Sequence, residues 1–215
     1  MAAAHSIEKT ADGSDTLRHP VTGDTYHSLR GAVGESLHVF INNGLATVGK
    51  SEISVLEMGL GSGLNAWLTL EYSTLHGMRI DYTGIELYPV SAETARKLNY
   101  TADPLFMALH EAVWEKPVSL TQKFTLTKTG TDFSTMIFTR TFDIVYFDAF
   151  SPDSQPELWT AERFSKLYEA IIPGGTLVTY SAKGTVKRAL REAGFEVERL
   201  AGALGKRHML RATKD

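Results

Sequence analysis

The stretch that decides the fold is Ile53-Ser-Val-Leu-Glu-Met-Gly-Leu-Gly-Ser-Gly-Leu-Asn65. Its first six residues predict a short buried strand, and apolar residues recur at helical spacing from Leu64 to Leu75. The glycines between these two elements tolerate positive φ and let a ligand approach the backbone closely. A strand that turns through glycines into a helix therefore predicts a ligand site where the unpaired N–H groups of the helix N-terminus face outward.

Strand and helix patterns alternate on both sides of this turn. Further strands are predicted at 79–86, 124–128, 142–148, 176–180, 195–200 and 207–213. Helices are predicted at 31–45, 90–98, 105–112, 183–193 and from a cap at Ser154 or Thr160 to Ile171. We therefore predict an α/β fold, Rossmann-like and doubly wound, with a seven-stranded, mostly parallel sheet. The loop between the last two strands is too short for a crossover helix, so these strands should form an antiparallel hairpin.

The predicted domain organisation is simple. Residues 1–45 read as a small N-terminal extension of short strands and one helix, packed on a core of residues 46–215. The whole chain has 215 residues, of which 43% are hydrophobic and 22% charged, which is ordinary for a globular protein. The chain is long enough to bury a substantial core.

Composition excludes several classes of protein. The absence of cysteine excludes a disulfide scaffold, an iron–sulfur cluster, a thiolate zinc site and a cysteine nucleophile. The seven histidines form no metal-binding pattern, so we expect no metal. No apolar run approaches the ~18 residues of a membrane span, and the N-terminus has no secretory signal. We expect a cytoplasmic protein without membrane contact.

Charge is spread unevenly along the chain. The net charge is -3, but residues 183–215 hold nine Lys or Arg against four Asp or Glu. This asymmetry predicts an anionic partner at the C-terminal part, with an ordinary solvated basic surface as the alternative.

The glycine spacing selects the kind of ligand. A dinucleotide fingerprint would need glycine at position 64, which is Leu64. An acid, Glu57, followed by glycines at 59, 61 and 63 fits S-adenosylmethionine (SAM), whose ammonium and sulfonium groups are cationic. The closing antiparallel hairpin also distinguishes the SAM methyltransferase version of this architecture from the dinucleotide version.

Acidic residues follow three later strands. Glu86 ends the second strand and can accept hydrogen bonds from ribose hydroxyls, and Asp132 follows the third strand within reach of an adenine amino group. A surface glutamate and a helix cap are the structural alternatives. Asp148 ends the fourth strand, where a carboxylate can bind a cationic amine and help remove its proton. An alkylamine has a pKa of ~10 and needs this help at neutral pH.

The sequence resembles the SAM-dependent methyltransferases that complete 5-methylaminomethyl-2-thiouridine at the tRNA wobble position. The resemblance covers nearly the whole chain and rests on several motifs. These are Asp12-Gly-Ser14, Tyr26-His-Ser-Leu-Arg-Gly-Ala32, Glu35-Ser36, Leu56–Asn65, Gly84-Ile-Glu-Leu-Tyr-Pro89, Asp148-Ala-Phe-Ser-Pro152, Pro156-Glu-Leu-Trp-Thr160, Gly174–Tyr180, Ala193-Gly-Phe195 and Gly205-Lys-Arg-His-Met-Leu-Arg211.

The resemblance implies a function and a site. The methyl group of SAM would pass to the primary amine of 5-aminomethyl(-2-thio)uridine in the tRNA anticodon stem-loop, with Asp148 at the amine. The implied cofactor-binding residues are Glu57, Gly59, Gly61, Gly63, Asn65, Glu86, Leu87 and Asp132. The implied substrate-binding residues are Tyr26, His27, Ser28, Phe150, Lys183, Lys206 and Arg207. Thr129-Gly-Thr-Asp-Phe133 departs from the family pattern, because the acid is offset from the glycine.

Some members of this family carry a flavin-dependent oxidase that makes the aminomethyl group, and nothing in this chain resembles it. We therefore expect a stand-alone methyltransferase, with a separate aminomethyl-forming enzyme acting upstream. Three alternatives stay open: a small-molecule amine N-methyltransferase, a polyamine aminopropyltransferase-like enzyme and a non-enzymatic RNA-binding module.

Overall fold

A computed structural model describes residues 5–20, 22–133 and 135–215. The strands are β1 (Ser6–Lys9), β2 (Asp15–Arg18), β3 (Glu52–Met58), β4 (Arg79–Ile85), β5 (Pro117–Ser119), β6 (Phe124–Thr129), β7 (Phe142–Phe147), β8 (Ile171–Thr179), β9 (Glu196–Ala201) and β10 (His208–Thr213). The α-helices are α1 (Ala32–Ser36), α2 (Leu64–His76), α3 (Ala92–Ala95), α4 (Pro104–Glu111), α5 (Ala161–Ala170) and α6 (Gly184–Glu192). Shorter or wider helical turns are η1 (Leu37–Asn42), η2 (Leu45–Thr47) and η3 (Pro156–Leu158).

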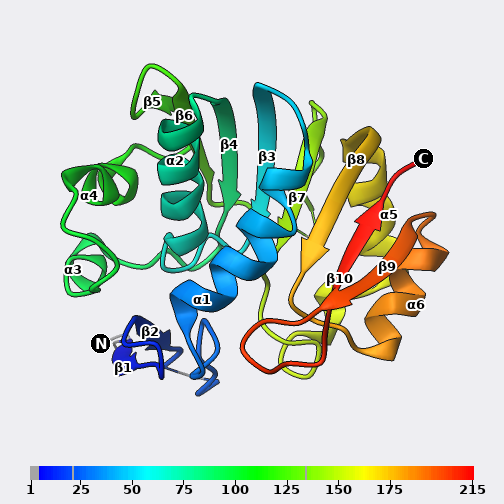
Figure 1. Cartoon of the computed structure of the whole chain (residues 1–215), viewed down its shortest axis with the longest axis horizontal. Coiled ribbons are helices and arrows are strands. Elements are labelled where there is room, and N and C mark those ends of the chain that lie inside the picture. Colours follow the sequence, from blue (N-terminus) through cyan, green and yellow to red (C-terminus); the bar gives the residue numbers. More distant parts are fainter. Residues whose placement is uncertain (1–4, 21, 134) are drawn as a thin grey trace.

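The main sheet confirms the predicted fold class (Figure 1). Its strand order is β5-β6-β4-β3-β7-β8-β10-β9. Strands β6, β4, β3, β7 and β8 are parallel, and β10 pairs antiparallel with both β8 and β9, as the short final loop predicts. The parallel strands all end on the lower side in Figure 1, where the predicted ligand residues follow them.

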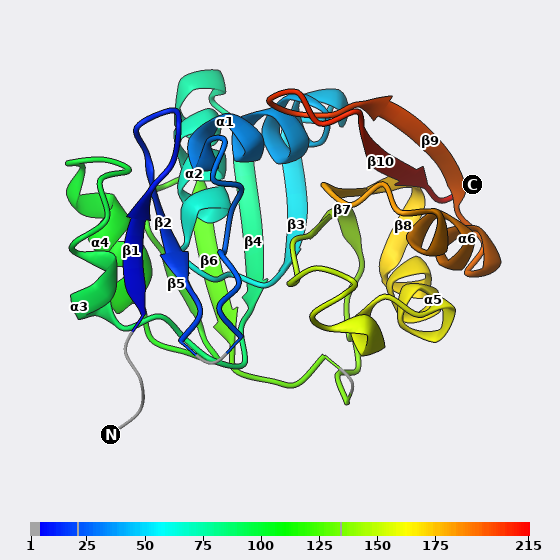
Figure 2. The ribbon, with the colours of Figure 1, turned by 90° about the horizontal axis from the view of Figure 1, so that it is seen from below.

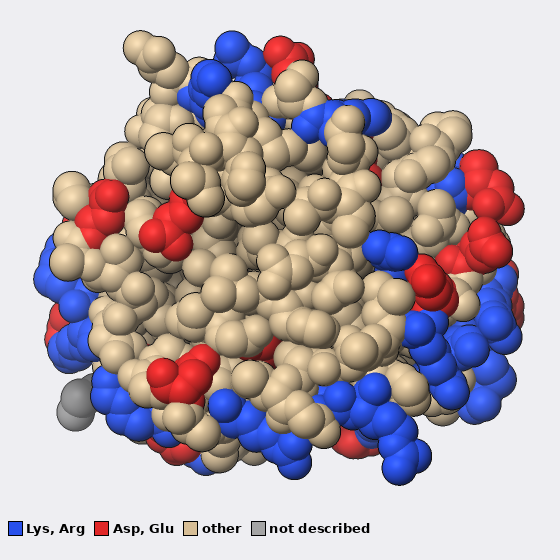
Figure 3. Space-filling view, viewed as in Figure 1, with Lys and Arg blue, Asp and Glu red and all other residues tan. Residues whose placement is uncertain are grey.

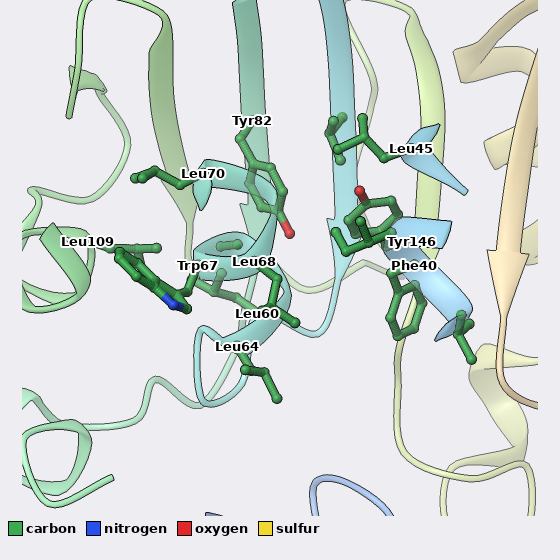
Figure 4. Close-up of a cluster of buried hydrophobic side chains, with 14 of the residues drawn as sticks. Phe40, Leu45, Leu60, Leu64, Trp67, Leu68, Leu70, Tyr82, Leu109 and Tyr146 are labelled. Atoms are coloured by element: carbon green, nitrogen blue, oxygen red, sulfur yellow. The ribbon is translucent and has the colours of Figure 1, made fainter. Parts of the chain in front are cut away.

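Helices cover both faces of the sheet, so the molecule has three layers (Figure 2). On one face α2 and η1 pack on the central strands. Figure 4 shows Phe40 of η1 close to Tyr146 of β7, with Tyr82 of β4 on the same side of the sheet, and the ring centroids of Phe40 and Tyr146 lie 5.2 Å apart. On the other face α5 and α6 form a second buried cluster around Phe147 and Phe164. The two clusters hold the central strands, and hence their carboxyl ends, in fixed positions.

Two strands differ from the sequence prediction. The eighth strand, β5, is a three-residue antiparallel edge strand in a segment whose pattern is ambiguous. Strand β8 begins at Ile171 rather than Thr176, because Pro173, Gly174 and Gly175 form an irregular bulge within it. Gly174 adopts a φ of +76°, which lets the chain kink and continue as a strand.

The helices also differ in extent. The predicted helix at 31–45 is divided into α1, η1 and η2, and the one at 90–98 shortens to α3, which Ser91 caps. Thr160 rather than Ser154 caps α5, since its hydroxyl accepts a hydrogen bond from the Arg163 amide.

The N-terminal segment folds as a β1–β2 hairpin that docks beside α3 and α4 (Figures 1 and 2). The backbone N–H of Asp15 donates to Asn99 Oδ1 at 2.7 Å, and the Asn99 N–H returns a bond to Asp15 Oδ2 at 2.8 Å. This docking brings residues 24–28, which follow the hairpin, over the carboxyl ends of the parallel strands.

Candidate functional site

A cavity of about 600 Å³ lies at the carboxyl ends of the parallel strands, under the N-terminal segment. Its carboxylates are Asp24, Glu35, Glu86, Asp132, Asp148 and Glu157, and its cationic side chains are Arg163 and Lys206. The described part of the lining is therefore acidic overall, which favours a cationic ligand.

The glycine turn forms one wall of this cavity. Gly59 and Gly61 have φ values of +91° and +51°, and a Cβ on Gly61 would lie 2.9 Å from the Tyr26 ring. The amide N–H of Gly61 donates to Glu86 Oε2 at 2.9 Å, which fixes the Glu86 carboxylate beside the turn. Gly63 also has positive φ, but it faces His110 rather than the cavity. The turn thus needs glycine at Gly59 and Gly61 both for its backbone and for the space around it.

Asn65 connects two acids at the rear of the cavity. Its Nδ2 donates to Glu57 Oε1 at 2.9 Å and to Asp148 Oδ2 at 2.8 Å. The hydroxyl of Tyr82 donates to the other Glu57 oxygen at 2.7 Å. Glu57 and Asn65 are both buried and neither lines the cavity, so their effect on a ligand passes through Asp148.

Burial changes the acidity of these groups. Burial raises the pKa of Glu57 to about 8, against the hydrogen bonds from Tyr82 and Asn65. The pKa of Asp148 is raised well above its usual range, first by burial and then by the charge of Glu57. The pKa of Glu86 is also raised, chiefly by burial. Asp148 is therefore a stronger base than an exposed aspartate.

The N-terminal segment supplies a second wall. Tyr26 and Phe150 pack edge to face with ring centroids 5.1 Å apart, and His5 Nε2 lies 2.9 Å from the Tyr26 hydroxyl. The backbone N–H of Ser28 donates to Glu35 Oε2 at 3.0 Å. The pKa of His27 is lowered to about 4 by burial, so its ring is neutral at pH 7.

The remaining predicted residues separate into two groups. Leu87 and Asp132 both line the cavity, next to the buried Phe133. Lys206 lines it too, whereas Lys183 lies outside the lining and pairs with Asp153, and Arg207 is exposed. The structure therefore brings Lys206, but not Lys183 or Arg207, to the cavity.

Sequence reasoning assigned no role to Glu35, Tyr180 or Tyr82. Glu35 forms an ion pair with Lys206, 171 positions away, and the Tyr180 hydroxyl donates to the Ala149 carbonyl at 2.9 Å. No local pattern marks these residues, because their partners come from distant segments. Glu35 and Tyr180 do stand in motifs of the resemblance, and those positions were the available signal.

Among the described residues, no group of three or more His, Asp or Glu could hold a metal ion. No helix within that part of the chain is both long and apolar enough to cross a bilayer.

An acidic cavity at a glycine turn of a doubly wound sheet that closes with an antiparallel hairpin defines a class: enzymes that bind a cationic nucleoside cofactor. Residues 104–215 match the model of a family described as S-adenosyl-L-methionine-dependent methyltransferase. The chain belongs to this family and is a SAM-dependent methyltransferase.

Curated relatives extend the similarity to most of the chain. The tRNA 5-methylaminomethyl-2-thiouridine biosynthesis bifunctional protein MnmC of Ralstonia nicotianae is 33% identical over 204 residues, 86% of this chain and 31% of the relative. The protein of the same name from Burkholderia multivorans is 31% identical over 217 residues, 91% of this chain and 33% of the relative. This chain spans about a third of the length of these relatives.

Solved structures agree on the fold. The crystal structure of MNMC2 from Aquifex aeolicus has a TM-score of 0.83 and 28% identity, covering 99% of this chain and 71% of that one. Spermidine synthase from Thermotoga maritima has a TM-score of 0.57 at 13% identity, covering 100% of this chain and 80% of that one, which shows a shared fold alone.

The cavity fits SAM on its own geometry. A Cβ at Gly59 would crowd the Asp148 carbonyl and one at Gly61 the Tyr26 ring, so the wall of the cavity here is bare backbone. The lining carries an excess of carboxylates, and Asn65 Oδ1, behind it, is a buried oxygen with no partner among the described residues. These features suit a ligand that is cationic and lies against the backbone.

Proposed function

We propose that this enzyme methylates the primary amine of 5-aminomethyl(-2-thio)uridine at the wobble position of tRNA. The similarity to MNMC2 over 99% of the chain carries this proposal, and the names of the MnmC relatives supply the substrate. The acidic cavity supports it, because an aminomethyl group is a cation at neutral pH.

We assign the cofactor end of the cavity to the glycine turn. Gly59 and Gly61 would lie against SAM, with Leu87 and Phe133 beside its base, Asp132 at the adenine edge and Glu86 at the ribose hydroxyls. Glu57 and Gly63 would act from behind the wall of the cavity. Glu57 would hold the side chain of Asn65, and Gly63 would let the chain turn into the first residue of α2. When bound, SAM supplies a methyl carbon on a positively charged sulfur.

Asp148 is the proposed acceptor-side base. Its carboxylate can hold the ammonium group and accept its proton, which leaves a lone pair on the amine nitrogen. Asn65 fixes one carboxylate oxygen through the 2.8 Å hydrogen bond, so the other oxygen is available to the amine. Tyr26, His27, Ser28 and Phe150 would cover the reacting groups and exclude water.

The tRNA would approach across basic surface outside the cavity. In Figure 3 Lys and Arg atoms gather at the lower right, over α6, with Asp and Glu atoms beside them along the right-hand edge. Lys187 and Arg191 stand on α6 and Arg199 on β9, and the pKa of the half-buried Lys187 is lowered, first by desolvation and then by the charges of the two arginines. Phosphate contacts from this surface and from Lys183 and Arg207 would give affinity that falls as salt rises. A tRNA substrate also implies cytoplasmic activity and an enzyme upstream that forms the aminomethyl group.

The decisive experiment uses methyl-labelled SAM and tRNA from cells that lack the final methylation. We expect label in 5-methylaminomethyl(-2-thio)uridine after nucleoside digestion. Label in free amines but not in tRNA would favour a small-molecule methyltransferase. Consumption of decarboxylated SAM without methyl transfer would favour an aminopropyltransferase.

A further inference from the structure

The β9–β10 region meets the N-terminal helical segment beside the cavity. The loop between β9 and β10 packs on α1, where Arg30 Nη1 donates to the Leu204 carbonyl at 3.2 Å. A second contact joins His38 Nε2 to the Ala201 carbonyl at 2.8 Å. This packing carries Lys206 into the cavity from outside the parallel part of the sheet.

Lys206 is held there by two partners. Its ammonium group pairs with the buried carboxylate of Glu35 and lies 5.4 Å from the centroid of the Tyr180 ring. Glu35 is fixed in turn by the N–H of Ser28. A cation placed between a carboxylate and an aromatic face has a defined position.

This pair and Asp148 line the same cavity. After burial and Glu57, the charge of Glu35 raises the pKa of Asp148 further, and the charge of Lys206 lowers it. The Asn65 hydrogen bond also lowers that pKa. The opposing signs of Glu35 and Lys206 mean that each cancels part of the other at the acceptor position.

Cancellation matters because the cavity is acidic. A second uncompensated carboxylate beside Asp148 would stabilise an ammonium ion and make its proton harder to remove. A lone lysine there would instead repel the amine. A pair with no net charge neither stabilises the ammonium ion nor repels the amine. The pair therefore leaves Asp148 as the carboxylate that decides the protonation of the acceptor amine.

We propose that Glu35 and Lys206 form a compensating charge pair whose function is to let Asp148 alone govern deprotonation of the acceptor amine. Both are positioning residues, and the inference rests on the proposed function. The proton leaves the ammonium nitrogen for an Asp148 oxygen, and the electron pair of the broken N–H bond stays on nitrogen.

Other charged or titratable groups line the same cavity and are common to every variant below. They are Glu86 and Tyr88 after β4, Asp132 after β6, Glu157 of η3, Arg163 of α5, Tyr180 after β8, and His19, Asp24, Tyr26 and His27 of the N-terminal segment. Glu57 of β3 lies behind this lining and acts on Asp148 by its charge.

The test is the pH dependence of kcat with saturating undermodified tRNA, because kcat reports groups in the bound complex. Glu35→Gln keeps an acceptor for Ser28 but leaves Lys206 uncompensated, so the acid limb should move about one pH unit lower. Lys206→Met keeps the packing on Tyr180 but leaves Glu35 uncompensated, so the limb should move about one unit higher. The double variant should return close to the wild-type midpoint.

Controls separate this idea from a structural role. Lys206→Arg keeps the charge and should keep the profile. Lys97→Met removes a lysine from an exposed pair with Glu93, outside the cavity lining, and should not shift the profile. Affinity for S-adenosylhomocysteine shows whether each variant retains its fold.

The inference would be overturned if the single variants lost activity without opposite shifts in the midpoint of the acid limb. It would also be overturned if the midpoint of the double variant lay further from the wild-type value than the midpoints of both single variants. If Lys206→Met does not fold, Glu35→Gln alone decides: an unchanged or raised midpoint contradicts the pair. Failure of the wild type to methylate tRNA would instead remove the proposed function, so the two failures are distinguishable.

Discussion

Asn65 joins the buried Glu57 to the half-buried Asp148, and its side chain fixes the orientation of the Asp148 carboxylate. Both N–H groups of its amide are used, one on Glu57 and one on Asp148. Removing either acid would leave a buried donor unpaired, which costs about 1–3 kcal/mol. The three residues therefore act as a unit that sets the position and basicity of Asp148.

Asp148→Asn tests the base directly. The amide keeps the size of the side chain but cannot accept the amine proton, so kcat should fall about 100-fold or more. S-adenosylhomocysteine should still bind within a few-fold of wild type, as measured by equilibrium dialysis. A loss of less than about tenfold in kcat would show that Asp148 is not the base.

Gly61→Ala tests the glycine turn. A Cβ at this position combines a φ of +51° with a 2.9 Å approach to Tyr26, so it should weaken S-adenosylhomocysteine binding at least about tenfold. Gly49→Ala is the matched control, because Gly49 has a φ of +68° and open space around it. Equal loss in both variants would mean that backbone strain, not the cofactor wall, is responsible.

At the scale of elements, the sequence predicted best where the pattern is local. The strand–glycine–helix unit at 53–75 and the final antiparallel hairpin follow from periodicity and loop length. The first part of β8, from Ile171, was missed because its bulge carries Pro173-Gly174-Gly175, which reads as a break. The Glu35–Lys206 contact was missed because it joins two elements through tertiary packing alone.

The N-terminal hairpin is an element whose docking can be tested. Asn99→Ala removes its two side-chain hydrogen bonds, to Asp15 and to the Gly13 carbonyl. We expect faster amide exchange in residues 6–18 and a loss of about 1–2 kcal/mol in hairpin docking. Asn42→Ala, at an exposed asparagine outside the hairpin, is the control. Unchanged exchange in Asn99→Ala would show that other contacts hold the hairpin.

For the whole molecule, the buried Glu57 makes stability depend on pH. Its pKa is about 8 when folded, against an ordinary value of 4.5, so the folded state binds more protons between these values. This contribution is full below about pH 4.5 and is lost as the pH rises through 8.

Glu57→Gln should therefore flatten the pH profile of stability. Between pH 5 and 8 the free energy of unfolding of the wild type should fall relative to the variant, by on the order of 2 kcal/mol. Urea denaturation across this range measures the difference. A wild type that gains stability relative to Glu57→Gln as pH rises would show that Glu57 is ionised and stabilised in the folded protein.

The central claim is that the cavity at the carboxyl ends of β3, β4 and β7 holds a sulfonium cofactor beside Asp148. Isothermal titration of the wild-type protein with S-adenosylhomocysteine tests it most directly. We predict saturable binding with one ligand per chain, since one cavity contains the glycine turn and Glu86. A well-folded protein that gives no saturable heat at any temperature tried would contradict the claim.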